Sequence, residues 1–205
     1  MLFRSLVQPA SGRARIFGRS PSDVKAKMRI GYVPEEVVLF DSLTPREYLE
    51  FVTSVRRMDS ATASQRFRKL AEAFGLSEHV DTPIGALSKG SRQKVALIAA
   101  LIHEPPLLIL DEPFTGLDVA SSRVLKEILA SHVRRDGAVL MSTHVMELAE
   151  KLCTRVGIMS GGKIVSEGGV SELRELVGAA GLEEVFLKVT GQEAWVSGVV
   201  KALEE

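Results

Sequence analysis

Short apolar runs alternate along the chain with longer stretches whose apolar residues recur at helical spacing. The clearest run is the aliphatic stretch at residues 107–110, which ends in Asp111, Glu112 and Pro113. Such a short run is typical of a strand buried on both faces of a parallel sheet, and Pro113 cannot continue the ladder. Further strands are predicted at residues 14–18, 29–33, 138–143 and 184–189, with a hairpin of 155–158 and 163–167. Helices are predicted after Thr44 and at residues 61–74, 88–103, 119–135, 146–153, 171–177 and 193–203.

This order of elements predicts an α/β fold with one sheet domain. Strands and helices alternate through most of the chain, which is typical of a parallel sheet with crossover helices. Residues 42–103 carry helical patterns without a strand, so they are predicted to form a helical subdomain inserted into the sheet domain. Residues 155–205 are expected to form a hairpin and a tail.

The two acids after the aliphatic run are candidate functional residues. They would lie at the carboxyl end of a strand, where open α/β sheets bind ligands. Because neighbouring strand side chains point to opposite faces, Asp111 and Glu112 are expected to differ in role, one holding a metal and the other facing a water. The alternative is a strand end with two solvated acids.

Bulk composition narrows the classes of protein. Hydrophobic residues make up 45% of the 205 residues, enough for a substantial core. The 26 Lys and Arg residues balance the 26 Asp and Glu residues, which argues against nucleic-acid binding through a basic surface. Cys153 is the single cysteine, so no disulfide framework is predicted and a reducing cytosol is expected. No apolar stretch approaches the roughly 20 residues of a membrane span.

Several motifs, taken in order, resemble those of the ATP-binding subunit of ABC transporters. They are the signature motif at residues 87–91, Walker B at 107–112, the D-loop at 116–118 and the switch histidine at His144. The resemblance extends from Met1 to about Gly191. It implies a P-loop NTPase-like sheet domain with a helical subdomain, and ATP hydrolysis with Mg²⁺ as the metal.

The resemblance also implies roles for single residues. Asp111 would hold Mg²⁺ through its water shell, and Glu112 would be the base or the residue that positions the attacking water. His144 would contact the γ-phosphate, and Asp118 would lie near the nucleotide. Glu35 stands where the Q-loop usually has glutamine, and its carboxylate could also bind Mg²⁺. A structural His144 and plain exposed acids at Glu112 and Glu35 are the alternatives.

The signature-like segment is expected to bind nucleotide at a helix N-terminus. Ser88 is a good capping residue, and free N–H groups at a helix start attract anions. In the family this motif acts on the ATP of a partner across a dimer interface. Lys89 replaces the usual first glycine, Gly90 keeps the second, and Ser91 replaces the glutamine. The alternative is a capped amphipathic helix without a ligand.

The glycine-rich phosphate loop of the family does not occur in this sequence. A near match, Gly157 followed by Gly162 and Lys163, has Ile164 where Ser or Thr must bind Mg²⁺, so we reject it. Residues 1–7 resemble the end of the helix that follows this loop, and the chain is therefore expected to begin just past it. Strands beside the absent segment are expected to be unpaired, with apolar faces partly open.

The predicted function is an ATPase subunit that energises a membrane exporter. A tail at residues 182–187, followed by Thr190 and Gly191, resembles subunits that serve drug- and antibiotic-type exporters. The expected partners are a transmembrane permease, met by Tyr32, Phe40 and the helix after Thr44, and a second nucleotide-binding domain. Packing of the subdomain is the other role of these residues. The expected location is the cytoplasm, on the inner face of the cell membrane. Two alternatives remain: a non-hydrolysing half-site partner that supplies the signature motif in trans, and a non-functional fragment.

Overall fold

The computed structural model describes residues 9–204, which divide after Ser142 into two compact units. The helix-like segment predicted at residues 1–7 lies outside the described residues. The first unit carries the acidic strand and the signature-like helix, and the second unit begins at Thr143. Each unit is described below by itself.

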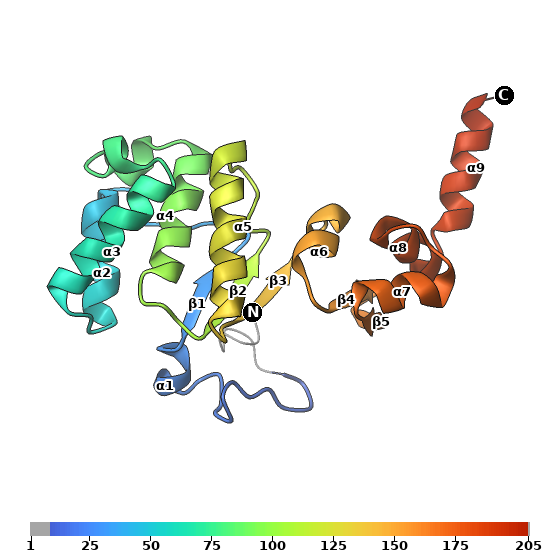
Figure 1. Cartoon of the computed structure of the whole chain (residues 1–205), viewed down its shortest axis with the longest axis horizontal. Helices are drawn as coiled ribbons and strands as arrows, with labels where there is room; N and C mark the ends of the chain where they lie inside the picture. Colours follow the sequence, from blue (N-terminus) through green and yellow to red (C-terminus); the bar gives the residue numbers. More distant parts are fainter. Residues whose placement is uncertain (1–8, 205) are drawn as a thin grey trace. The chain divides into compact units, whose positions relative to one another are not determined.

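A parallel three-stranded sheet forms the centre of the first unit (Figure 1). Its order is β1 (Ile30–Val33), β2 (Leu107–Asp111) and β3 (Ala138–Ser142). The register places Val33 beside Leu110, and Asp111 beside Ser142. Because all three strands run in the same direction, their carboxyl ends lie at one edge of the sheet, where the sequence predicted the ligand site.

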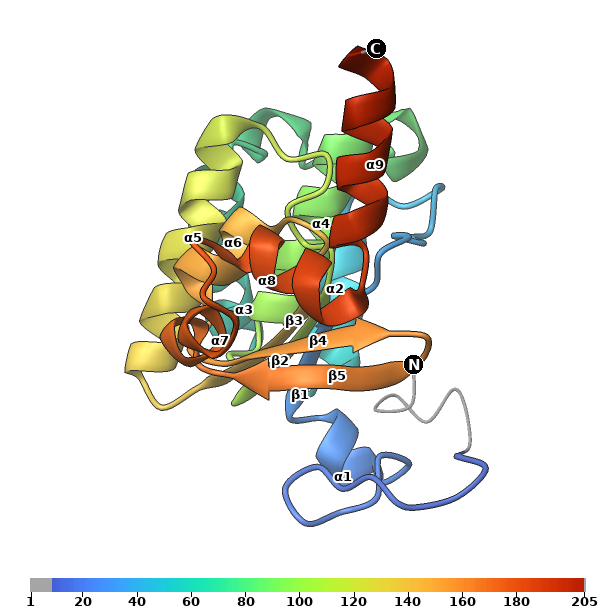
Figure 2. The ribbon, with the colours of Figure 1, turned by 90° about the vertical axis from the view of Figure 1, so that its right-hand side faces the viewer.

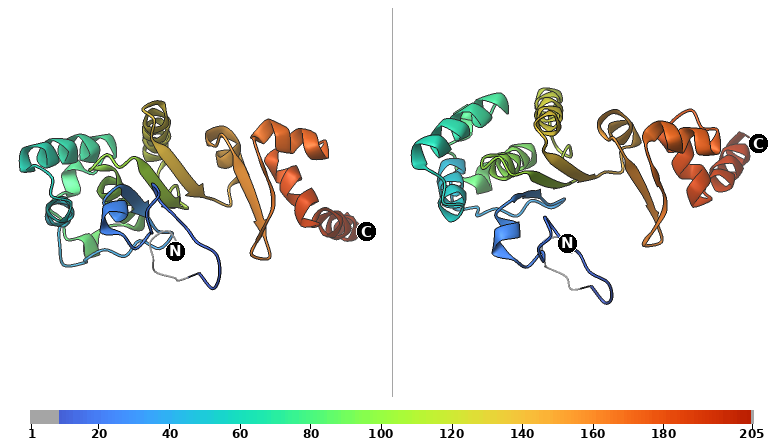
Figure 3. Two further views of the ribbon diagram at one scale, coloured as in Figure 1. Left: turned by 90° about the horizontal axis from the view of Figure 1, so that it is seen from below. Right: turned by 60° about the horizontal axis from the view of Figure 1, so that its bottom comes forward.

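The two faces of the sheet are covered unequally. Helices α4 (Lys89–Leu101) and α5 (Val119–Arg134) cover one face, where Leu108 and Leu110 of β2 are buried. On the other face, Leu107 and Ile109 are half-buried against Ile16, Ala26 and Ile30, on the side of helix α1 (Val24–Lys27) (Figure 3). Among the described residues β3 is an edge strand, and Leu140 on it is 48% exposed. The predicted two-sided burial of β2 is therefore complete on one face only.

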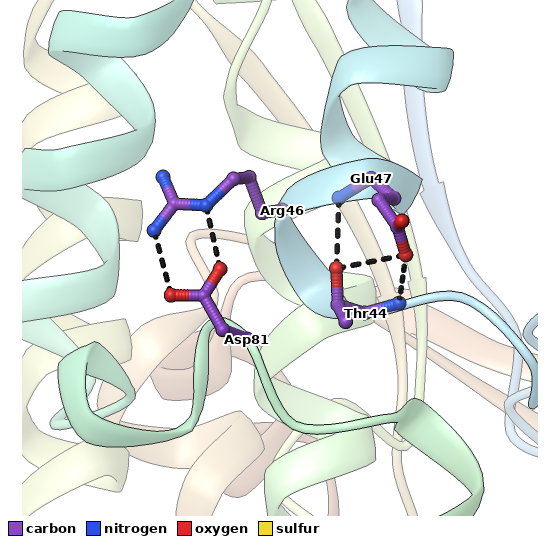
Figure 4. Close-up of polar contacts among 4 residues, drawn as sticks. All are labelled: Thr44, Arg46, Glu47 and Asp81. Carbon is purple, nitrogen blue, oxygen red and sulfur yellow. Dashed lines mark hydrogen bonds and ion pairs between the residues drawn. The ribbon is translucent and has the colours of Figure 1, made fainter.

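Helices α2 (Pro45–Val55), α3 (Ser60–Ala73) and α4 follow β1, with the short 3₁₀ helices η2 (Ser77–His79) and η3 (Ile84–Ala86) between α3 and α4. The predicted start of α2 is confirmed: Pro45 is its first residue and Thr44 caps it. The Thr44 hydroxyl accepts from the Glu47 N–H at 3.2 Å, and the Glu47 carboxylate accepts from the Thr44 N–H at 2.8 Å (Figure 4). This reciprocal capping box fixes the direction in which the chain enters α2.

The strand predicted at residues 14–18 is wrong. Ile16 and Arg19 exchange two backbone hydrogen bonds of 2.8 and 3.0 Å around Phe17 and Gly18, both of which have positive φ. This is a tight two-residue turn rather than a strand. Gly18 adopts its positive φ without steric cost. The guanidinium carbon of Arg29 lies 3.9 Å from the centre of the Phe17 ring, in a cation–π contact.

The second unit contains a hairpin and helices (Figure 2). Its elements are α6 (Met146–Leu152), β4 (Val156–Ser160), β5 (Lys163–Gly168), α7 (Val170–Val177), α8 (Leu182–Thr190) and α9 (Glu193–Glu204). The strands β4 and β5 pair antiparallel, as predicted. The Gly162–Lys163 near match therefore lies at a hairpin turn, and its rejection as a phosphate loop stands.

The strand predicted at residues 184–189 is also wrong, because this segment lies in helix α8. Its apolar side chains at positions 182, 185, 186 and 189 follow helical spacing, and Leu182 and Val185 are buried. An apolar run of this length cannot be assigned from periodicity alone. The Glu184 carboxylate and the Lys188 ammonium, one helical turn apart, form a 2.7 Å ion pair that supports the helix.

The helices of residues 9–204 are all too short or too polar to cross a membrane.

Candidate functional site

Strand β2 ends in a carboxylate, that of Asp111, at the carboxyl edge of the sheet. Asp111 is its last residue, and the hydroxyl of Ser142, the last residue of β3, donates a hydrogen bond to that carboxylate. The neighbouring strand thereby orients Asp111 through a side chain that the sequence analysis did not single out. A carboxylate oxygen has several lone-pair sites, so one hydroxyl bond leaves acceptor capacity for a cation or a water.

Glu112 lies beyond the strand, in a strained backbone conformation. Its φ is 45°, in the left-handed region that side chains other than glycine rarely adopt. Its N–H donates to the Ser142 carbonyl and its carbonyl accepts from the Thr115 N–H, each at 3.1 Å. The sequence prediction that strand alternation sets the direction of Glu112 is wrong, because β2 ends at Asp111. The turn that follows the strand sets this direction instead. Strain of this kind costs on the order of 1–3 kcal/mol and clusters at functional sites.

The same edge carries the predicted Q-loop residue. Glu35 follows Val33, the last residue of β1, by two positions and is exposed. Among the described residues, no three His, Cys, Asp or Glu side chains gather closely enough to bind a metal alone. The oxygen donors at this edge, the Asp111 carboxylate and the Ser142 hydroxyl, nevertheless fit Mg²⁺, which prefers oxygen ligands and keeps several of its waters.

The N-terminus of α4 is capped as predicted. Ser88 precedes α4 in extended conformation, and its hydroxyl oxygen accepts from the Ser91 N–H at 3.1 Å. The two hydroxyls of Ser88 and Ser91 are also bonded, at 3.0 Å. Lys89 is exposed in the first turn. The helix start therefore presents N–H groups and a positive charge, which together suit an anionic ligand.

Gly90 allows α4 to pack closely against the predicted D-loop. A Cβ on Gly90 would collide with the carbonyl oxygen of Gly116, which itself has φ 77°. Two backbones that touch in this way leave no room for a side chain. Gly90 is therefore needed for packing within the chain, in addition to any contact with a nucleotide.

Two further residues of α4 join it to the turn of residues 111–113, called the acidic turn below, and to Asp118 beyond it. The buried Gln93 amide donates to the Pro113 carbonyl at 3.1 Å. The Lys94 ammonium forms a 2.7 Å ion pair with Asp118, which caps α5 by accepting from the Ser121 N–H, also at 2.7 Å. The hydrogen bond from Lys94, followed by those from Ser121, holds the pKa of Asp118 well below its usual range. Asp118 therefore stays charged at neutral pH.

Gln93 and Lys94 are given no role by the sequence pattern, because the signature-like segment ends at Ser91. One signal was available: Gln93 is polar but lies between Gly90 and Leu97 at helical spacing, on the inward face of α4. A polar residue at a core position indicates a specific buried partner. The pairing of Lys94 with a residue 24 positions away has no comparable local signal.

His144 belongs to the second unit, so it is not among the residues that the first unit brings together. It is exposed and lies two residues before α6. Next to it, the Thr143 hydroxyl accepts from the Val145 N–H at 3.1 Å, which fixes the turn that leads into α6. Its predicted contact with a γ-phosphate stays a prediction.

The first unit thus combines a parallel sheet, acids at its carboxyl edge and a capped helix N-terminus, the architecture of an α/β nucleotide-binding domain. The chain belongs to the ABC transporter family, whose family model matches residues 1–115. The α/β fold class is thereby confirmed, because a solved structure titled "Structure of ATP binding subunit of ABC transporter" superposes with a TM-score of 0.86 at 30% identity, over 92% of this chain and 80% of that one.

Curated relatives agree with this assignment. The ABC transporter ATP-binding protein NatA of Bacillus subtilis is 30% identical over 91% of this chain and 77% of its own length. EcsA of the same organism, an ABC-type transporter ATP-binding protein, is 32% identical over 92% of this chain and 78% of its own length. The chain spans 53% of the B. subtilis protein YhaQ, which is 34% identical over 77% of this chain.

Proposed function

We propose that the chain is an ATP-hydrolysing subunit that energises export through an ABC transporter. The observation that carries this proposal is the acidic turn at the carboxyl edge of the sheet, where Asp111 and Glu112 are held by β3 and α4. Hydrogen bonds from Ser142 and Gln93 fix both sides of this turn. Catalysis of phosphoryl transfer relies on positioning and electrostatics, so a rigid acidic turn is what the reaction requires.

The roles of the acids follow from their places. Asp111 and Glu35 would hold Mg²⁺, which would supply positive charge to neutralise the phosphates of ATP. Glu112 accepts the proton of a water as that water adds to the γ-phosphorus and the bond to the β-phosphate breaks. Its backbone strain suits a side chain that must keep one direction. His144 supports the γ-phosphate.

The start of α4 serves the second nucleotide site of a dimer. Ser88, Lys89, Gly90 and Ser91 present N–H groups, hydroxyls and a cation toward the γ-phosphate of an ATP held by a partner domain. The contacts of α4 with Pro113, Gly116 and Asp118 support this role, because they join the helix start to the acidic turn. Asp118 is proposed to lie near that nucleotide.

An aromatic cluster, formed by the exposed Phe40 and Phe51 and the half-buried Tyr48, is proposed to meet the transmembrane permease. Phe40 packs edge-on against the other two rings at 6.2 and 5.9 Å, yet Phe40 is 55% and Phe51 is 51% exposed. Exposed apolar clusters are typical of interaction sites. Docking there would hold the chain on the inner face of the membrane. Export as the direction rests on the resemblance of the segment around α8 to exporter subunits.

The test is ATPase activity of the chain co-purified with its permease in membranes. Glu112→Gln keeps the shape of the side chain but removes the proton acceptor, so kcat should fall by at least about 10²-fold with little change in KM. Glu127→Gln on α5, which removes an exposed carboxylate paired with Arg123, is the matched control and should leave kcat unchanged. Equal activity in both variants would contradict the proposed role of Glu112.

A second candidate is a half-site partner that hydrolyses no ATP itself. The observation that favours it is that the signature side is locally complete: Ser88, Gly90 and their supports all lie within the first unit. Titration with a fluorescent ATP analogue separates the candidates. Binding by the chain alone supports the hydrolysing subunit, binding only in a mixed dimer supports the half-site partner, and no binding in either supports a non-functional fragment.

A further inference from the structure

A cleft of about 590 Å³ lies between α2 and α3, away from the acidic turn. One face of each helix lines it: residues 46, 49, 50, 53 and 54 of α2, and residues 60, 63, 64, 67, 68 and 71 of α3. Both sets follow helical spacing. The proposed nucleotide site uses none of these residues. The volume is in the range of small-molecule sites, which is about 300–1,000 Å³.

Several of the side chains that line the cleft are small. Ala63 and Ala71 on α3 face Thr53 on α2, whose hydroxyl is bonded to the Leu49 carbonyl of its own helix at 2.9 Å. Neighbouring helices normally interdigitate larger side chains across the gap between their axes. Here the deep wall is apolar and buried, with Leu49 at 2% and Ile102 at 1% exposure, while serines line the mouth.

Two arginines fix the helices that border the cleft. The Arg66 guanidinium ties α3 to the end of α4, through the Ile102 carbonyl at 3.2 Å and the Glu104 carboxylate at 2.6 Å. Arg46 ties α2 to the loop after α3 by two bonds to Asp81, of 2.7 and 3.0 Å (Figure 4). These ties fix each of the two helices to a neighbouring segment of the chain, at different places along the helices.

The charged side chains that line the cleft indicate which charge a ligand should carry. Asp81 satisfies the Arg46 guanidinium and raises its pKa, and Glu50 also interacts with that charge. Arg68 differs, because its guanidinium forms no hydrogen bond or ion pair with any residue of the described chain. An apolar wall with an uncommitted guanidinium at its mouth suits an apolar body that carries an anionic group.

We propose that this cleft binds a small amphipathic anion, with its apolar body against Leu49, Phe67 and Ile102 and its carboxylate or sulfonate at Arg68. The occupant would set the spacing of α2 and α3. Because α2 also carries Tyr48 and Phe51, the cleft provides a way for a small molecule to alter the aromatic cluster. The site is distinct from the proposed ATP site and is tested separately from it.

The test is a fluorescence titration of the full chain with 1-anilinonaphthalene-8-sulfonate at low salt. Arg68→Gln should raise the Kd by about five- to tenfold, because it removes a charge-assisted contact. Lys69→Gln, the matched control at the next residue outside the lining, should change the Kd by less than about twofold. Glu50→Gln should lower the Kd, because it removes a repelling carboxylate from the opposite wall.

A second pair tests the apolar body. Ser64→Phe places a ring in the cleft and should raise the Kd at least about tenfold, whereas Gln65→Phe, at the neighbouring exposed position, should not. Far-UV circular dichroism checks that the variants fold. If Ser64→Phe does not fold, the Arg68 and Lys69 pair decides. No saturable binding, or equal Kd values across Arg68→Gln and Lys69→Gln, would overturn the proposal.

Discussion

Helices α4 and α3 of the first unit meet their neighbours in opposite ways. On α4, Leu97 and Ile98 are fully buried, and Gly90 leaves no gap against Gly116. On α3, Ala63 and Ala71 face a cleft that the neighbouring side chains do not fill. The close packing lies where the proposed chemistry needs fixed positions. The open packing lies beside α2, which carries the proposed permease contact.

Substitutions should therefore change the free energy of unfolding more on α4 than on α3. A close-packed site cannot absorb a lost or an added methyl group, because every neighbour is already in contact. A helix pair that leaves a cleft has room for one.

Removing a large side chain from α4 should have the largest effect. Leu97→Ala should lower the free energy of unfolding by about 2–5 kcal/mol, because it removes a fully buried side chain and leaves a cavity. Ala63→Leu on α3 should change it by less than about 1 kcal/mol, because the added atoms enter the cleft. Urea unfolding of the full chain, followed by circular dichroism, measures both. Similar losses of unfolding free energy in the two variants would contradict the difference in packing between α4 and α3.

Adding a methyl group at Gly90 should cause the second-largest loss of stability. Gly90→Ala should destabilise by about 1–3 kcal/mol, because its Cβ collides with the Gly116 backbone, which has no flexible end to move aside. Gly198→Ala in α9 is the control, since no atom of the described residues lies within 4 Å of its Cβ position and alanine favours a helix. The same unfolding assay applies. A Gly90→Ala protein as stable as the Gly198→Ala protein would mean that α4 can move away from the D-loop.

The free energy of unfolding should fall at acid pH because of His103, which lies just after α4. Burial, and next the charge of Arg56, lowers the pKa of His103 from 6.5 to about 4, and its buried Nδ1 has no partner among the described residues. The unfolded chain therefore binds the proton first. Stability from His103 is present above about pH 6.5 and is lost towards pH 4, with a slope of at most about 1.4 kcal/mol per pH unit.

Replacing His103 isolates this contribution. His103→Gln should flatten the pH dependence of unfolding between pH 6.5 and pH 4 relative to the parent chain. The exposed His79 provides the control, and His79→Gln should leave the curve unchanged. Identical curves for the parent and His103→Gln would show that the folded chain accepts the proton as readily as the unfolded chain does.

The smallest effect concerns the tie between Lys94 and Asp118. Lys94→Met should destabilise by about 0.5–1 kcal/mol, because Asp118 is exposed to solvent. The lowered pKa of Asp118 means that its stabilisation is present above pH 4 and is lost as the pH falls further. The difference between Lys94→Met and the parent should shrink below that pH. A double-mutant cycle with Asp118→Asn should give a coupling energy of the same size, and zero coupling would contradict the tie.

Patterns of neighbouring residues predicted several of the strands and helices. Contacts between residues distant in sequence could not be predicted in this way. The aliphatic run before Asp111 and the cap at Ser88 each depend on neighbouring residues, so β2 and the start of α4 were found correctly. Phe17 was misread, because a positive φ at an aromatic residue has no sequence signal. Glu184 fell in a segment whose short apolar run suits a strand or a helix equally. The hydroxyl of Ser142 reaches Asp111 from another strand, and no local pattern announces that contact.

The central claim is that the start of α4 completes an ATP site on a partner domain. The measurement is the ATPase rate and the nucleotide stoichiometry of a purified dimer between this chain and a nucleotide-binding subunit that carries a complete phosphate loop. Ser88→Arg places bulk and an ill-fitting side chain where hydroxyl and N–H groups would meet the γ-phosphate, while loss of the cap costs only about 1 kcal/mol. Ser171→Arg, at an exposed position in α7, is the control.

We predict that Ser88→Arg lowers the ATPase rate and the bound nucleotide of the dimer by at least about tenfold, which corresponds to about 1.4 kcal/mol, and that Ser171→Arg changes neither. A dimer that keeps its rate and its bound nucleotide with Arg at position 88 would contradict the claim.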